Sequence, residues 1–132
     1  VLCGAALAAA TAGLGGMTAC SAASDRWSAV VPTAPVDLGG ADAVPVGGSL
    51  LYREKKLVVS QPAEGEFKAF GAVCTHGGCV LTSVKELEAD CSCHGSRFDT
   101  TTGEVLRGPA TAPLPEVPVR ADGGTLVAGP DA

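Results

Sequence analysis

Two short stretches, CTHGGC at residues 74–79 and CSCHGS at residues 91–96, hold both histidines and four of the six cysteines of this 132-residue chain. The thiol and imidazole groups fall within 21 residues: Cys74, His76, Cys79, Cys91, Cys93 and His94. Thiolate and imidazole are preferred ligands of soft and borderline metals. As ordinary core residues, the two imidazoles would need buried polar partners. The pattern therefore predicts a metal site built from two glycine-rich loops.

Two kinds of metal centre agree with these donors. A structural zinc ion takes two cysteines and two histidines. The first pair, however, is C-x-H rather than the C-x(2–4)-C of common zinc modules, and zinc leaves Cys79 and Cys93 unused. A [2Fe-2S] cluster with two thiolates on one iron and two imidazoles on the other is the second possibility.

The paired pattern C-x-H-x-G-C and C-x-C-H-G-S resembles the cluster-binding boxes of Rieske iron–sulfur proteins, in the disulfide-bearing, cytochrome bc-type branch. The resemblance runs from about Ala41 to the C-terminus and includes the proline loop at Gly108–Pro109. It implies thiolate ligation of the inner iron by Cys74 and Cys91. It also implies that His76 and His94, near the surface, bind the outer iron through imidazole. Finally, it implies a disulfide between Cys79 and Cys93.

The same resemblance gives roles to residues around the cluster. Two neutral imidazoles in place of two thiolates make reduction easier, with potentials of about −150 to +300 mV for Rieske centres. Ser96 stands where the family has a hydroxyl donor to a bridging sulfide, and such donors raise the potential. Phe98 replaces the tyrosine of high-potential members, so we expect a potential below the top of the range. Gly77 replaces the bulky leucine of quinol-oxidising members, so we expect a more exposed histidine edge.

The remaining sequence predicts an all-β fold, a small antiparallel sandwich or barrel carrying two cluster-binding loops. A hairpin with a charged tip is expected at residues 49–60, short alternating runs occur at residues 66–73 and 83–91, and a last hairpin is expected over ADGG at residues 121–124. The Rieske-type domain is expected to cover residues 41–132. No long run with helical periodicity is present.

The N-terminal part has a different composition. Residues 1–19 contain no charged residue, whereas all 23 charged residues follow Cys20. We interpret residues 1–20 as a signal or lipoprotein segment with Cys20 as the lipidated residue, or as a membrane-anchor helix. Residues 21–40 are interpreted as a flexible linker. These features predict an exported protein at the outer face of a bacterial cytoplasmic membrane, a compartment that permits disulfides.

The net charge of −5 argues against nucleic-acid binding. The leading interpretation is a one-electron carrier between a redox donor and acceptor at the membrane, with no catalysis by this chain alone. The alternative is the iron–sulfur subunit of a cytochrome bc-type quinol–cytochrome c reductase complex. Three others are kept: the small subunit of an exported molybdenum oxidase, the ferredoxin of a ring-hydroxylating oxygenase, and a zinc-binding module.

Overall fold

The computed structural model describes residues 31–75 and 77–132 of the chain. The proposed signal or anchor segment, Cys20 and His76 lie outside the described residues, as does the first half of the proposed linker. Over the described residues the chain forms eleven β-strands and two short 3-10 turns, with no α-helix. All named strand pairs are antiparallel, which confirms the all-β prediction.

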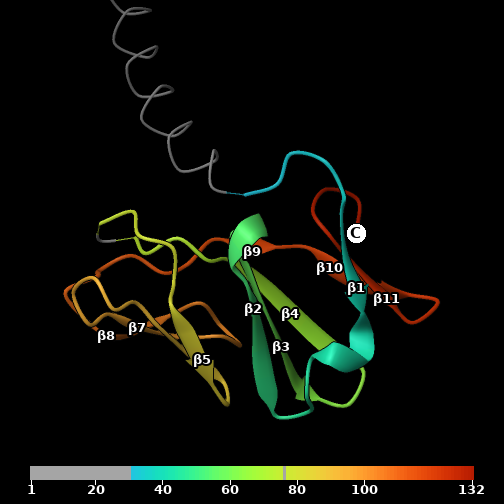
Figure 1. Ribbon diagram of the computed structural model, residues 1–132, viewed down its shortest axis with the longest axis horizontal. Helices are drawn as coiled ribbons and strands as arrows, with labels where there is room; N and C mark the ends of the chain where they lie inside the picture. Colours follow the sequence, from blue (N-terminus) through green and yellow to red (C-terminus); the bar gives the residue numbers. More distant parts are fainter. Residues whose placement is uncertain (1–30, 76) are drawn as a thin grey trace, which may run out of the picture.

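Two sheets form the barrel-like half of the molecule, on the right of Figure 1. One has the order β1-β11-β10, with the bounds Val36–Gly40, Thr125–Ala128 and Val119–Asp122. The other has the order β2-β3-β4-β9, with the bounds Gly48–Tyr52, Leu57–Ala63, Glu66–Gly71 and Glu116–Val117. The predicted hairpins at 49–60 and around ADGG are confirmed as β2–β3 and β10–β11.

A third sheet forms the other half of the molecule and supports the cysteine-rich loops. It has the order β5-β6-β7-β8, with the bounds Ser83–Lys85, Glu88–Asp90, Arg97–Asp99 and Val105–Arg107. Residues 83–91 thus form a tight hairpin, because the backbone turns at Glu86, where φ is +54°.

Strand β3 separates two hydrophobic cores. Leu57 and Val59 pack into the core of the barrel half. Val58 points the opposite way, as side chains alternate along a strand, and packs into the core that contains Cys74 and Cys91. All three aliphatic side chains are fully buried, so β3 contributes to both halves.

Three buried hydroxyl groups connect the two halves. Ser60 donates through Oγ to the carbonyl oxygen of Thr100 at 2.7 Å. Ser49 donates to the carbonyl oxygen of Glu86 at 2.7 Å, and its Oγ lies 2.7 Å from Thr100 Oγ1. Since the single Ser49 proton is used toward Glu86, Thr100 is the donor of that pair.

The folded part begins earlier than expected. The linker interpretation was wrong for residues 36–40, because β1 pairs with β11 and buries Leu38. A bulge between Asp37 and Gly39 interrupts the β1–β11 register. Among the residues that the structure covers, no helix is both long and apolar enough to span a bilayer.

Candidate metal centre

The two cysteine-rich loops leave the ends of strands in two different sheets and lie away from β1 and β11 (Figure 1). The first follows β4, and its base is closed where the amide of Leu81 donates to the carbonyl oxygen of Ala72 at 2.9 Å. The second joins β6 to β7. The hydrogen bond at the base of the first loop and the pairing of β6 with β7 therefore fix where the two loops begin and end.

Both loops use the same backbone hydrogen bonds. In the first, Gly78 N–H donates to the Cys74 carbonyl at 2.9 Å, and Cys74 N–H donates to the Cys79 carbonyl at 2.6 Å. In the second, Gly95 N–H donates to the Cys91 carbonyl and Cys91 N–H to a carbonyl five residues later, both at 2.9 Å. Gly78 and Gly95 have φ of +76° and +84°, which favours glycine at these turns. Each loop is therefore a tight ring beginning at a buried cysteine.

A disulfide joins the loops. Cys79 and Cys93 are bonded with an S–S distance of 2.06 Å, which confirms the predicted pair. The sulfur atoms of Cys79, Cys91 and Cys93 all lie within 4.8 Å of one another. Because two of these sulfurs are bonded to each other, only Cys91 of this group can serve as a thiolate ligand. The disulfide thus lies directly beside a candidate ligand.

The two remaining cysteines of the loops are buried thiols. Cys74 and Cys91 are each about 1% exposed and pack in one core. Burial raises the pKa of the Cys91 thiol, and the neighbouring side chain of Cys74 raises it further. Backbone amides of Cys93 and His94 point toward the Cys91 sulfur and lower its pKa. These amides are suited to stabilising negative charge on sulfur.

The imidazole that the structure describes is at the surface. His94 is exposed, unlike the two buried thiols. Gly77 lies beside its ring, because a Cβ atom at Gly77 would be 3.4 Å from His94 Cε1 and 3.5 Å from Nδ1. No side chain at position 77 covers this edge of the imidazole.

A third loop, residues 108–113, packs against both cysteine-rich loops. The Ala110 amide donates to Ser96 Oγ at 3.1 Å, and Ser96 is fully buried. Because the Ser96 oxygen accepts this bond, its proton remains to be donated elsewhere. Thr75 Oγ1 donates to the Ala112 carbonyl at 2.6 Å, a contact that the sequence analysis missed. The sequence feature that could have indicated this contact is the position of Thr75, a hydroxyl residue between the candidate ligands Cys74 and His76.

Two other predicted residues have contrasting positions. Phe98 is fully buried among the side chains that surround Cys74 and Cys91. It therefore contributes packing but no hydroxyl donor. Pro109 is exposed on the third loop.

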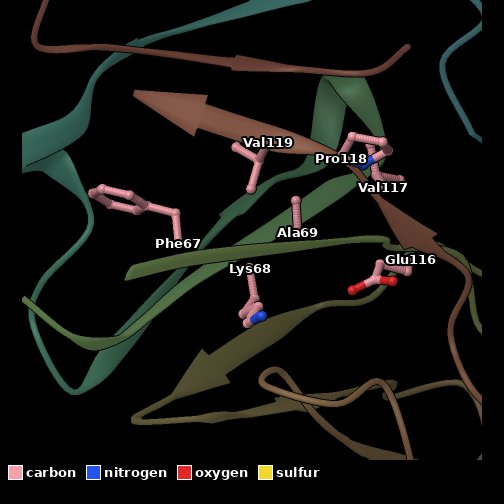
Figure 2. A pocket seen from close by; sticks show the side chains of 7 residues that line it. All are labelled: Phe67, Lys68, Ala69, Glu116, Val117, Pro118 and Val119. Atoms are coloured by element: carbon pink, nitrogen blue, oxygen red, sulfur yellow. The ribbon is translucent and has the colours of Figure 1, made fainter. Parts of the chain in front are cut away.

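A cavity of about 390 Å³ lies elsewhere, between β4 and the β9–β10 segment. In Figure 2, Lys68 points to the side opposite Phe67 and Val119. No cysteine or histidine lines this cavity, so we assign the metal chemistry to the loops and not to this hollow.

Residues 26–118 match the family model of the Rieske [2Fe-2S] domain. This chain belongs to the Rieske family. The buried thiols, the exposed imidazole and the disulfide fit a [2Fe-2S] cluster as the cofactor of this domain. The two buried thiols, one of them with amide donors, would hold such a cluster from the core side, and imidazole would hold it from the surface side. Zinc is disfavoured, because it would not need the disulfide-bridged loop pair.

The Rieske relatives include a cytochrome b6-f complex iron-sulfur subunit from Chlorobaculum thiosulfatiphilum. It is 35% identical over 96 residues, which are 68% of this chain and 50% of that protein. A Haloferax mediterranei protein named as a Rieske subunit of a respiratory nitrate reductase is 36% identical over 90 residues, covering 63% of this chain and 41% of that protein. The chain thus spans about half the length of the curated relatives it matches, or less.

The fold agrees with solved Rieske structures. The plasma membrane Rieske protein PetC3 from Synechocystis PCC 6803 superimposes with a TM-score of 0.58 and 28% identity. The superposition covers 70% of this chain and 97% of that chain. It confirms the Rieske-type fold class.

Proposed function

We propose that this Rieske electron-transfer domain serves an exported, membrane-tethered protein that passes single electrons between a donor and an acceptor. When bound, the [2Fe-2S] cluster supplies reversible one-electron chemistry. The observation that carries the proposal is the pair of identically bonded loops, joined by the Cys79–Cys93 disulfide and each beginning at a buried cysteine.

Each predicted ligand has a distinct task in this proposal. Cys74 and Cys91 would hold the inner iron as thiolates in the core, and the amides near Cys91 would stabilise the added negative charge. His94 and His76 would hold the outer iron, with the exposed His94 on the side that faces a partner. Ser96 has a proton left to donate toward the cluster, which would favour the reduced state.

Export is supported by chemistry and by composition. A disulfide persists in oxidising compartments and is rare in the reducing cytosol. The Cys79–Cys93 bond is of that kind, and the uncharged residues 1–19 suit a signal or anchor. We therefore place the domain at the outer face of the cytoplasmic membrane, held there through its N-terminal segment or a lipid on Cys20.

A second candidate role is the iron–sulfur subunit of a cytochrome bc-type complex. Its support is the similarity to cytochrome b6-f iron-sulfur subunits. Gly77 favours the independent carrier, because no side chain at this position lies over the ring of His94. In both roles the chain supplies an electron relay and no substrate chemistry of its own.

Electron paramagnetic resonance tests the proposal. The purified protein is measured after ascorbate and after dithionite. A Rieske-type signal with ascorbate indicates a high potential and favours the quinol-oxidising complex. A signal that requires dithionite favours the independent carrier. A colourless protein with bound zinc and no signal under either condition would overturn the proposal.

A further inference from the structure

The turn between β2 and β3, residues 53–56, is strongly basic in an otherwise acidic protein. It has three cations and one carboxylate in four consecutive residues, whereas the chain carries a net charge of −5. All four side chains are exposed: Arg53, Glu54, Lys55 and Lys56. We call this segment the basic turn.

The basic turn is held against the base of the first cluster loop. Arg53 Nε donates to the Leu81 carbonyl at 3.1 Å, and the Ala72 amide donates to the Lys56 carbonyl at 2.8 Å. Figure 1 shows this turn between the barrel half and the first loop. Ala72 precedes Cys74 by two residues, which is at most about 7 Å of backbone. Arg53 and the backbone of Lys56 therefore lie at the base of the first loop, whereas Lys55 Nζ donates to the Asp37 carbonyl in β1 at 2.6 Å.

The loops themselves carry no fixed charge. Residues 71–82, 91–96 and 108–115 contain no Asp, Glu, Lys or Arg. Asp90, which borders the second loop, is paired with Arg97 at 2.7 Å. Arg107 and Glu116, which border the third loop segment on its two sides, are both exposed and opposite in charge. The excess charge beside the loops is therefore that of the basic turn.

We propose that the basic turn is a docking site for an acidic face of the protein that exchanges electrons with this domain. The proposal rests on the proposed electron-transfer function. Charge steers association over a Debye length of about 8 Å at physiological ionic strength, so the local charge decides which partner surface approaches the loops. The net charge of −5 alone would favour a basic partner; the basic turn specifies the opposite sign at the electron-transfer end.

The experiment compares two double variants of the cluster-loaded protein with equal net charge. Lys55→Gln/Lys56→Gln removes two cations from the basic turn, together with the exposed Lys55 bond to the Asp37 carbonyl, and leaves Arg53 bonded to Leu81. Lys68→Gln/Arg120→Gln removes two exposed cations from β4 and β10. Stopped-flow absorbance then follows the oxidation of each reduced protein by an acidic and by a basic c-type cytochrome.

At an ionic strength of about 10 mM, where screening is weak, we expect the turn variant to react at least about fivefold more slowly with the acidic cytochrome. The β4/β10 variant changes less than about twofold. The rate with the basic cytochrome does not fall in the turn variant. At about 0.5 M salt the difference between the variants disappears.

The outcomes distinguish a failure of the docking site from a failure of the electron-transfer function. Equal slowing in both variants would assign the effect to net charge and overturn the docking site. Unchanged rates in a protein with a normal resonance signal would also overturn it, while leaving the electron-transfer function intact. Loss of the signal in wild-type protein would instead remove the proposed function. Salt-sensitive binding to phosphatidylglycerol vesicles that is lost only in the turn variant would assign the basic turn to the membrane, against the proposal.

Discussion

Gly77 lies directly against the imidazole of His94, since a Cβ atom there would be 3.4 Å from Cε1. A Cβ atom at position 77 would make ordinary van der Waals contact with the ring, so a side chain has room to begin there. We expect Gly77→Leu to fold, to retain the cluster and to cover the exposed edge of the ring. Electron exchange with a small hydrophilic oxidant such as ferricyanide should then slow by about threefold or more, because a hydrophobic side chain keeps the oxidant at a distance. Gly77→Ala, which fills less space, is the control, and equal rates in both variants would show that the ring edge is not the exit.

His94 tests the ligand assignment. His94→Ala should abolish the Rieske resonance signal, because a cluster of this kind needs all of its protein ligands. His94→Cys should retain an iron–sulfur cluster with a lower potential, since thiolate adds negative charge. Ser92→Ala, at another exposed position of the same loop, is the control. A normal signal in His94→Ala would show that His94 is not a ligand.

Ser96 is expected to tune the potential. Ser96→Ala should keep the cluster and lower its potential by about 60 to 120 mV, the equivalent of one hydrogen bond to a charged group in a one-electron couple. Ser60→Ala is a matched control, because Ser60 is a buried hydroxyl that donates to a carbonyl away from the loops. Redox titration of both variants checks this. An unchanged potential in Ser96→Ala would mean that its proton is directed elsewhere.

Tyr52 is expected to control stability at alkaline pH. Burial raises the pKa of Tyr52 above 10.0, and Tyr52 Oη is a buried atom without a hydrogen-bond partner among the described residues. Above pH 10 the unfolded chain loses this proton before the native protein does, so stability falls as pH rises through that window.

Tyr52→Phe should remove this alkaline loss and leave stability at pH 7 unchanged or higher by up to about 1 kcal/mol. Denaturant unfolding at several pH values measures both effects. Because the chain has one tyrosine, ultraviolet titration of tyrosinate reports its pKa directly. A pKa of 10 or below in the native protein would contradict the prediction.

The disulfide should stabilise the loops. Cys79 and Cys93 are separated by 14 residues, and closing a loop of that length restricts the unfolded chain by about 3 kcal/mol. Cys79→Ser/Cys93→Ser should therefore unfold at lower temperature and lose its cluster faster. A phosphine reductant should destabilise the wild-type protein similarly and leave the double variant unaffected. Equal melting temperatures in all samples would show that the disulfide does not contribute to thermal stability.

Most of the fold could be predicted from local sequence patterns. The β2–β3 hairpin was predictable because apolar runs flank a charged turn, and the last hairpin because Gly123 and Gly124 sit at its tip with positive φ. The loops were predictable because cysteine, histidine and glycine occur at a specific spacing, and the disulfide because that pattern resembles the Rieske boxes. The ligand set, with His76 outside the described residues, stays a prediction.

Long-range pairing explains what the sequence did not reveal. Strand β1 exists because Leu38 is buried once β11 pairs with it, and β11 comes more than 80 residues later. The Thr75–Ala112 and Arg53–Leu81 bonds likewise join segments far apart in sequence. No local window contains both partners of such contacts, so periodicity and spacing could not indicate them.

The two-sided burial of β3 has a consequence for engineering. Because Val58 belongs to one core and its neighbours Leu57 and Val59 to the other, the cysteine-rich half cannot be transplanted to a new scaffold as residues 72–114 alone. The recipient must also offer a strand with a small aliphatic side chain and a serine-like donor at the positions of Val58 and Ser60. By the same reasoning, a chimera joined on either side of β3 would replace the residues of one hydrophobic core and remove from the other core the side chains that β3 contributes to it.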